Sequence, residues 1–115
     1  MQSVVETRAF QTDAKAADMG VDEVSALISH LAASPDAGEV MVGTGGARKL
    51  RWRRPGSGKS GGYRVITFFA GRDVPVFLLN VYTKGDQANL SAAERNTLAA
   101  ILPRLAAAYR KGTKP

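Results

Sequence analysis

The sequence has no cysteine, one histidine and one tryptophan in 115 residues. Without cysteine it has no disulfide framework, no zinc-thiolate site and no thiol nucleophile. A single histidine excludes a histidine-rich metal centre and the paired imidazoles with which many nucleases perform acid–base catalysis. No apolar run approaches the roughly 20 residues of a membrane span, and the first residues lack the basic and apolar regions of a secretion signal. We therefore expect a cytoplasmic protein without a metal, a cofactor or a membrane partner.

The positive charge of the chain is concentrated in one segment. Sixteen Lys and Arg residues against ten Asp and Glu residues give a net charge of +6. Residues 1–39 hold two basic and seven acidic residues, whereas residues 40–72 hold eight basic residues and no acid. Solubilising surfaces usually mix the two signs, and eight like charges repel one another unless a counter-surface offsets them. The segment therefore predicts a polyanionic partner, nucleic acid before anionic membrane, because no basic amphipathic helix is present.

Hydrophobic periodicity predicts a small α+β domain. Thr7 and Asp22 are candidate N-caps of two helices, and Ser91 with Glu94 fits the S-x-x-E capping box of a third. The expected order is β-α-α-β-β-β-α, a small antiparallel sheet with helices packed on it. We expect one domain over residues 1–110 and a flexible tail over 111–115. The expected strands cover 2–6, 49–53, 63–70 and 74–83, and the expected helices cover 8–18, 22 to about 33, and 91 to about 110.

The second expected strand has a cationic face. Leu50 and Trp52 alternate with three basic residues, so the two sets point to opposite sides of the strand. A glycine-rich run at 43–46 precedes it, which we interpret as a flexible connection. The three basic residues are Lys49, Arg51 and Arg53.

Two other features have less specific interpretations. Gly56–Ser60 resembles a phosphate-binding loop, but the pattern requires glycine where this chain has Arg53, and a strand follows instead of a helix. We interpret this run as a mobile cationic loop. His30 lies on the flank of an apolar helical stripe and is expected to be solvated. Three aromatic residues are candidates for stacking on bases, although Trp52 shares the apolar face of Leu50 and better fits the core. These are Trp52, Tyr63 and Tyr82.

Four sequence runs resemble the RelE/HigB family of bacterial toxins from type II toxin–antitoxin systems, and specifically its HigB branch. The resemblance extends over about residues 2–110. The first two runs hold the Gly-Gly-x-Arg-Lys-x-Arg-Trp and Lys-Ser-Gly-Gly-x-Arg signatures. The runs are Gly43–Trp52, Gly58–Ile66, Val76–Leu79 with Thr83-Lys84, and Ala88–Ser91.

The resemblance implies a RelE-like fold and a metal-independent endoribonuclease that acts as a ribosome-dependent mRNA interferase. Such an enzyme cleaves translated mRNA in the ribosomal A site with the RNA 2′-hydroxyl as nucleophile. The implied partners are a HigA-like helix-turn-helix antitoxin, the ribosome and mRNA. A non-catalytic protein of the same fold, either a ParE-like gyrase-inhibiting toxin or an RNA-binding module, is the alternative.

The resemblance also implies roles for individual residues. Arg64 matches a phosphate clamp, and Lys84 matches an acid or a second clamp. Many relatives carry a tyrosine where this chain has Leu90, so whether Tyr82 replaces it is open, as is which residue is the general base. The expected catalytic residues are Arg64, Lys84, Arg51 and Tyr82, and the expected RNA-binding residues are Arg48, Lys49, Arg53, Arg54 and Lys59.

Overall fold

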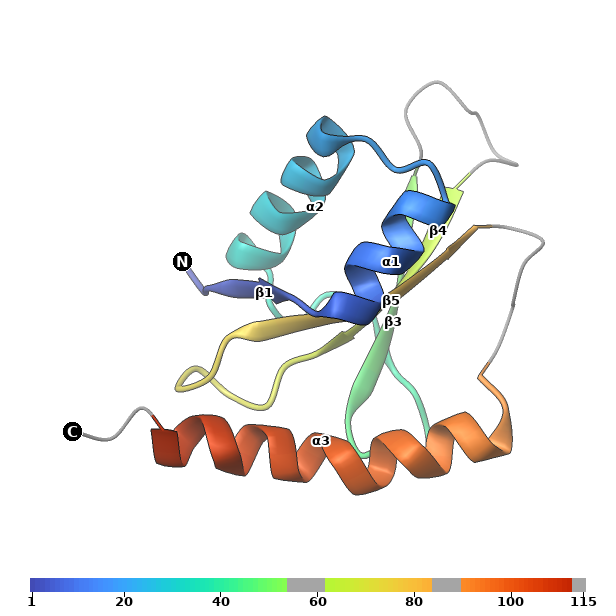
Figure 1. The fold of residues 1–115 in the computed structure, drawn as a ribbon. Helices are drawn as coiled ribbons and strands as arrows, with labels where there is room; N and C mark the ends of the chain where they lie inside the picture. Colours follow the sequence, from blue (N-terminus) through green and yellow to red (C-terminus); the bar gives the residue numbers. More distant parts are fainter. Residues whose placement is uncertain (54–61, 84–89, 113–115) are drawn as a thin grey trace.

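The computed structural model describes residues 1–53, 62–83 and 90–112, and these residues form a five-stranded sheet with helices on both faces (Figure 1). The expected α+β class is confirmed. The elements are β1 (Val4–Glu6), α1 (Arg8–Ala16), α2 (Val21–Ala33), β2 (Glu39–Val40), β3 (Ala47–Arg53), β4 (Gly62–Phe68), β5 (Val76–Thr83) and α3 (Ala92–Gly112).

The sheet has the strand order β1-β5-β4-β3-β2 and differs from the expected sheet in two ways. First, β1 pairs with β5 in parallel, whereas the other neighbours are antiparallel. The expectation of an antiparallel sheet is therefore wrong at this edge, because an apolar pattern indicates a strand but not its direction. Second, β2 was not expected, since a strand of two residues is too short to show a period of two.

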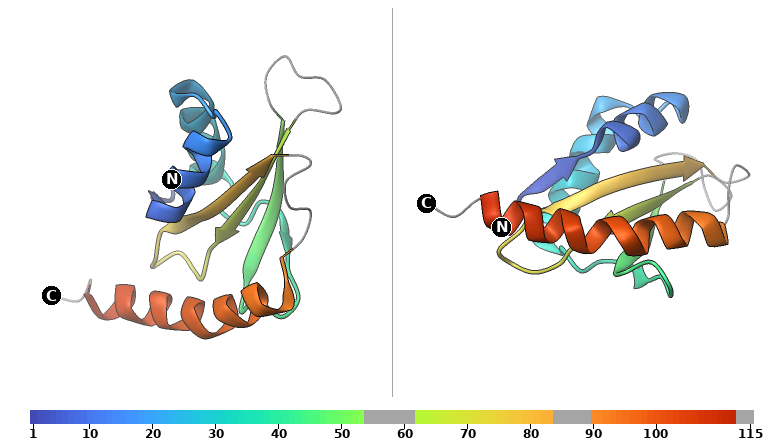
Figure 2. Two further views of the ribbon diagram at one scale, coloured as in Figure 1. Left: turned by 45° about the vertical axis from the view of Figure 1, so that its right-hand side comes forward. Right: turned by 60° about the horizontal axis from the view of Figure 1, so that its bottom comes forward.

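The helices α1 and α2 cover one face of the sheet and α3 covers the other (Figure 2). On the first face, Phe10, Leu27 and Leu31 are fully buried against β4 and β5. Thr7 caps α1 as expected, because its side chain accepts a hydrogen bond from the Phe10 N–H. α1 ends at Ala16, two residues before the expected end.

The N-cap of α2 is Gly20 and not Asp22, so that prediction is wrong. The Glu23 carboxylate accepts a hydrogen bond from the Gly20 N–H at 2.9 Å and satisfies this end of the helix from its third position. Because Glu23 in the first turn supplies the capping carboxylate, the N-cap residue itself can be a glycine. Asp22 is a favourable N-cap residue type, but here it lies inside the helix.

The capping box at the start of α3 is confirmed. The Ser91 N–H donates to Glu94 Oε1 at 2.8 Å, and the Glu94 N–H donates to Ser91 Oγ at 3.1 Å. The helix continues through Pro103 to Gly112 and so includes the first two residues of the expected tail, while residues 113–115 lie outside the described residues. Leu102 on this helix is buried against the sheet.

The glycine-rich run at 43–46 forms a turn against α3 and is not the flexible connection that we expected. Thr44 is fully buried, and its hydroxyl donates to the Met41 carbonyl at 2.7 Å and accepts from the Ala47 N–H at 3.0 Å. Gly45 has a φ of 77°, and a Cβ at this position would lie 3.1 Å from Ala99 Cα of α3. The backbone can approach the helix this closely only because residue 45 is a glycine.

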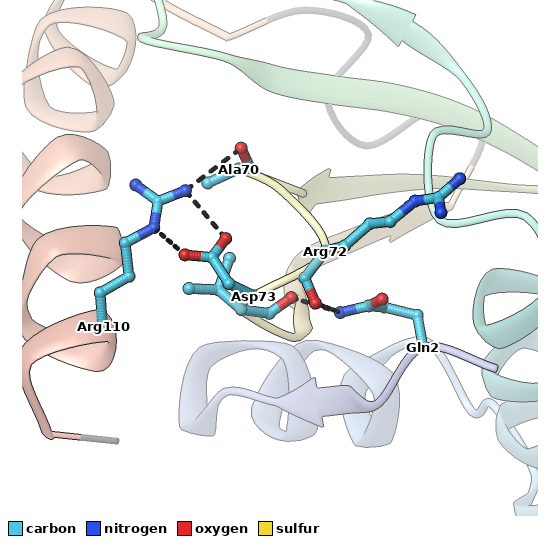
Figure 3. Close-up of polar contacts among 6 residues, drawn as sticks. Gln2, Ala70, Arg72, Asp73 and Arg110 are labelled. Carbon is cyan, nitrogen blue, oxygen red and sulfur yellow. Dashed lines mark hydrogen bonds and ion pairs between the residues drawn. The ribbon is translucent and has the colours of Figure 1, made fainter. Parts of the chain in front are cut away.

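The end of the sheet at the β4–β5 turn is tied to both ends of the described chain (Figure 3). Arg110 near the end of α3 forms an ion pair with Asp73 in this turn, with 2.6 Å between Nε and Oδ2. The hydrogen bond from Arg110 lowers the pKa of the Asp73 carboxyl. Gln2 donates to the carbonyls of Arg72 and Val74 from the other side of the turn. These contacts hold the β4–β5 turn against α3 and the N-terminal segment. They do not involve the opposite end of β3, β4 and β5.

Candidate functional site

Three of the four expected catalytic residues form one row across the central strands. Arg51 of β3 pairs with Arg64 of β4, and Arg64 pairs with Tyr82 of β5. Residues directly opposite each other on neighbouring strands share a face, with Cβ atoms about 4.5–5.5 Å apart. Tyr82 packs against the core under α3, so the row lies on the α3 face of the sheet. We call Arg51, Arg64 and Tyr82 the cationic row.

The cationic row combines two like charges without a neutralising partner. Arg51 is exposed, and Arg64 is partly exposed. None of the described carboxylates forms an ion pair with either guanidinium. Like charges directly opposite on neighbouring strands destabilise a sheet, and an anion bound between them would remove this cost. Two neighbouring guanidinium groups in this arrangement are chemically suited to contact an anion.

Tyr82 gives the row a neutral proton donor. Its side chain is half-buried, and burial is the largest cause of the raised pKa of its hydroxyl, followed by the negative charges of Glu94 and Asp13. An acid with a raised pKa remains protonated through neutral pH. Tyr82 therefore donates a hydrogen bond or a proton at physiological pH and is unsuited to accept one as a base.

A pocket of about 290 Å³ lies beside the cationic row, between β5 and the first turns of α3. Tyr82 belongs both to the row and to the pocket lining. Leu90, the residue at the position where many relatives carry tyrosine, is buried and also lines the pocket. Tyr82 and Leu90 thus line the same pocket. The lining residues are Asn80, Tyr82, Leu90, Ala93, Glu94, Thr97 and Leu98.

The other expected RNA-binding residues divide into three groups. Lys49 and Arg53 alternate with Arg51 along β3 and share its face; Lys49 pairs with Ile66, which packs under α3. Arg48 lies on the opposite face, and its Nη1 donates to the carbonyls of Asp36 and Gly38 at 3.0 and 3.2 Å. The structure does not bring Arg48 to the row. Outside the described residues lie Arg54, Lys59, Lys84 and the loop at 56–60.

The remaining candidates lie on the α1/α2 face. Tyr63 is 2% exposed, and its hydroxyl donates to Glu23 Oε2 at 2.9 Å, so the expectation that it stacks on a base is wrong. Trp52 packs against the core as expected, and its ring centroid lies 5.2 Å from that of His30. His30 therefore lies across the sheet from the cationic row and takes no part in the site.

Neither a metal site nor a membrane span is found in the part of the chain that the structure describes. Within residues 1–53, 62–83 and 90–112, no group of three or more His, Asp or Glu side chains is placed to hold a metal ion. In the same ranges, no helix combines the length and the apolar character that a membrane crossing requires.

The pocket was missed by the sequence interpretation, although a signal for it exists. Glu94 was recognised only as a capping residue. Ala93 and Thr97 are four residues apart, as are Glu94 and Leu98, so all four residues share one side of α3. The sequence therefore indicates which residues of α3 line the pocket, once Tyr82 is known to face this helix.

A comparison with known protein families identifies the family of the chain. The sequence profile of the family described as the RelE toxin of the RelE/RelB toxin–antitoxin system matches residues 2–113. The match covers nearly the whole chain and confirms the resemblance at the level of this family, while assignment to the HigB branch stays a prediction. The protein therefore belongs to the RelE toxin family and is the toxin of a toxin–antitoxin system, with a cognate antitoxin as its partner.

Proposed function

We propose that the protein is a ribosome-dependent mRNA interferase, an endoribonuclease that cuts translated mRNA in the ribosomal A site without a metal ion. The observation that carries the proposal is the cationic row, because two arginines and a tyrosine lie side by side on one face of the sheet. RNA cleavage by the 2′-hydroxyl needs charge stabilisation, a base for the 2′-proton and an acid for the leaving 5′-oxygen, and these three side chains would supply the charge stabilisation and the acid.

In the proposed reaction, the 2′-oxygen attacks the adjacent 3′-phosphorus. A bond between O2′ and phosphorus forms as the bond from phosphorus to O5′ breaks, which leaves a 2′,3′-cyclic phosphate and a 5′-hydroxyl end. Arg64, at the centre of the row, binds two phosphate oxygens with its planar guanidinium and stabilises the extra negative charge of the transition state. Arg51 holds and orients the same phosphate from the neighbouring strand.

Tyr82 protonates the departing 5′-oxygen in this mechanism. Its raised pKa keeps the hydroxyl protonated at neutral pH, which a general acid requires. Lys84, two residues further along the chain, matches the family position for an acid or a second phosphate clamp. The base that accepts the 2′-proton has no assigned residue, and His30 is excluded because it lies across the sheet.

RNA binding extends beyond the cationic row along the basic segment. Lys49 and Arg53 follow the row on the exposed face of β3, and Arg54 and Lys59 continue the charge in the sequence. Contacts of this kind bind the phosphate backbone without reading its sequence and weaken as the salt concentration rises. The ribosome would supply a positioned single strand. A HigA-like helix-turn-helix protein would be the antitoxin, and the cytoplasm would be the site of action.

The proposal is tested by inducing the protein in bacteria and mapping RNA ends by primer extension. The probe is one message in two forms, one translated and one with its start codon removed. We expect cuts that keep the reading frame in the translated form and none in the other. Growth arrest without translation-dependent cuts would contradict the proposal, and a change in DNA supercoiling in place of cuts would favour a gyrase-inhibiting toxin.

A further inference from the structure

We propose that Asp13, on helix α1, is a positioning residue for the proposed acid Tyr82, because it holds the irregular stretch of β5 that turns the Tyr82 side chain toward Arg64. The inference rests on the proposed function, since it names a residue that acts through the same acid. It is carried by a bulge in β5, by the packing on either side of this bulge, and by two hydrogen bonds to Asp13.

Strand β5 has one residue more than β4 between their paired positions. Ile66 of β4 pairs with Asn80. The next residue of β4, Thr67, pairs with Leu78 and not with Leu79. Leu79 is therefore the extra residue of a β-bulge, and a bulge changes the direction of the side chains that follow it in the strand.

The bulge determines which face of the sheet Tyr82 occupies. Before it, Leu78 packs in the core under α1 and α2, and Leu79 packs in the core under α3, as in a regular strand. If this alternation continued, residue 81 would face α3 and Tyr82 would face α1 and α2. The structure shows the reverse, with Val81 in the α1/α2 core and Tyr82 against the α3 core. Tyr82 thus lies beside Arg64 because of the bulge.

Asp13 holds the strand directly after the bulge. Its carboxylate oxygen Oδ2 accepts a hydrogen bond from the Asn80 side-chain amide at 3.0 Å and another from the Val81 N–H at 3.2 Å. The pairs of β1 with β5 extend over residues 76–78 of β5. Val81 lies beyond them, so the Asp13 carboxylate takes the place of a neighbouring strand at this N–H. Hydrogen bonds to a charged acceptor are roughly twice as strong as neutral ones.

Asp13 also acts on Tyr82 through its charge. Its negative charge is one of the causes of the raised pKa of the Tyr82 hydroxyl, after burial and the charge of Glu94. The two hydrogen bonds direct the side chain, and the charge helps to keep it protonated, so both effects favour an acid. A misplacement of about 1 Å at a reacting group can reduce a rate about 100-fold. Loss of the hydrogen bonds should therefore reduce the rate of the chemical step.

The test measures single-turnover cleavage of mRNA in the A site of stalled ribosomes over a range of protein concentrations. Asp13→Ala should reduce the maximal rate about 10-fold or more. The half-saturating concentration should stay within about 2-fold, because the arginines that bind phosphate are unchanged. Asp13→Asn should restore the rate to within about 3-fold of the wild type, because one amide oxygen has two lone pairs and can accept both hydrogen bonds.

A double-mutant cycle distinguishes an effect through Tyr82 from a general loss of structure. In Tyr82→Phe the acid is already absent, so adding Asp13→Ala should change the rate by no more than about 2-fold. Glu23→Ala is the matched control, because Glu23 is also half-buried and accepts two hydrogen bonds, from the Gly20 N–H and the Tyr63 hydroxyl. It should lower the melting temperature and leave the rate per folded molecule unchanged.

A milder variant serves if Asp13→Ala does not fold. Asn80→Ala removes one of the two hydrogen bonds to Asp13 and takes the same place in the cycle. It should reduce the maximal rate about 3-fold and should have no further effect in Tyr82→Phe.

The position of Tyr82 can also be followed without RNA. In protein labelled with ring-¹³C tyrosine, the NMR signal of Tyr82 is identified by its loss in Tyr82→Phe. Asp13→Ala should shift this signal and leave that of Tyr109 on α3 in place. Glu23→Ala should leave the Tyr82 signal unchanged.

The outcomes separate the role of Asp13 from the proposed function. Suppose that the wild-type protein cuts. Normal cutting by Asp13→Ala, an equal loss in both backgrounds of the cycle, or an unshifted Tyr82 signal then overturns the role of Asp13 and leaves the interferase. Wild-type protein that makes no cuts overturns the interferase proposal and the catalytic role of Asp13 with it, whereas a shifted signal would still show that Asp13 holds Tyr82.

Discussion

The two faces of the sheet use their charged side chains in opposite ways. On the α1/α2 face the carboxylates are committed to the fold: Glu23 accepts from the Tyr63 hydroxyl at 2.9 Å, and Asp13 accepts from the Asn80 amide at 3.0 Å and the Val81 N–H at 3.2 Å. On the α3 face, Arg51 and Arg64 stand side by side, and none of the described carboxylates pairs with them.

This difference explains how a basic chain can fold while Arg51 and Arg64 are not neutralised by the described carboxylates. Glu23 and Asp13 stabilise the helical side, across the sheet from the two arginines. The mutual repulsion of the arginines is a cost that the folded protein carries until an anion binds. Apart from those of Asp13, which acts through Tyr82 in our proposal, substitutions on the α1/α2 face should therefore change stability, and those in the cationic row should change activity.

The largest expected effect is that of Arg64→Ala. Removing the central guanidinium should reduce mRNA cleavage on the order of 1,000-fold and abolish toxicity, because one charge that stabilises the transition state is lost. Thermal unfolding should show equal or slightly higher stability, since the repulsion with Arg51 is removed. Arg72→Ala is the control: it removes an exposed arginine at the opposite end of β4 and should leave cleavage unchanged. Full toxicity of a folded Arg64→Ala protein would remove Arg64 from the mechanism.

The same substitution on the two faces gives the sharpest test of the comparison. Tyr82→Phe should reduce cleavage on the order of 100-fold, as expected for loss of a general acid, with little change in unfolding. Tyr63→Phe should lower the free energy of unfolding by about 1–2 kcal/mol, because it removes a buried hydroxyl that donates to Glu23. Its cleavage per folded molecule should equal that of the wild type. If Tyr63→Phe reduced cleavage and Tyr82→Phe reduced stability, the assignment of stability to the α1/α2 face and of activity to the α3 face would be wrong.

The pH profile adds a further check on Tyr82. A general acid must be protonated, and its raised pKa lies above the ordinary tyrosine value of about 10. Loss of this proton should therefore not reduce cleavage between pH 7 and 9. A fall in rate over that range that is present in the wild type and absent in Tyr82→Phe would contradict the assignment.

A pair of glycines tests how closely the 43–46 turn packs on α3. Gly43 and Gly45 have nearly equal φ values of 79° and 77°, but only at Gly45 would a Cβ meet the helix, 3.1 Å from Ala99 Cα. Gly43→Ala should lower the free energy of unfolding by about 1 kcal/mol through backbone strain. Gly45→Ala should lower it by about 2–3 kcal/mol, because a steric cost is added. Equal decreases in the free energy of unfolding, measured in urea, would show that the close contact with α3 adds no cost at Gly45.

The smallest effect is expected at the exposed ion pair of Asp73 and Arg110 (Figure 3). Because Arg110 lowers the pKa of the Asp73 carboxyl in the folded state, the pair stabilises the fold above the ordinary aspartate pKa of about 3.9. This stabilisation is lost as the pH falls through the lowered value. At low salt, Asp73→Asn should reduce the decrease in the free energy of unfolding that accompanies acidification below pH about 4. At 1 M salt the variant and the wild type should show the same decrease. A difference that persists at high salt would indicate a role in packing.

The sequence predicted local features better than those set by strand pairing. The capping box at Ser91 and the alternation of Leu50 and Trp52 are local patterns, and both were confirmed. The resemblance pointed to Arg51 and Arg64, and Tyr82 was a candidate substitute for a missing tyrosine, but the alignment of the three depends on the register of three strands. In particular, the pairing of β4 with β5 shifts between Ile66 and Thr67. An extra residue at such a shift moves the following side chains of that strand to the opposite face of the sheet. No short sequence pattern indicates where such a shift occurs.

The parallel pairing of β1 with β5 has a consequence for synthesis of the chain. Glu6 is synthesised well before Leu78, its partner in the sheet. At about 5–20 residues per second, roughly 4–14 seconds pass between the synthesis of the two. During that interval β1 has no neighbouring strand, and the same late strand delivers Tyr82 to the row. A nascent chain thus acquires its finished sheet and its proposed acid in the same step, when β5 is made.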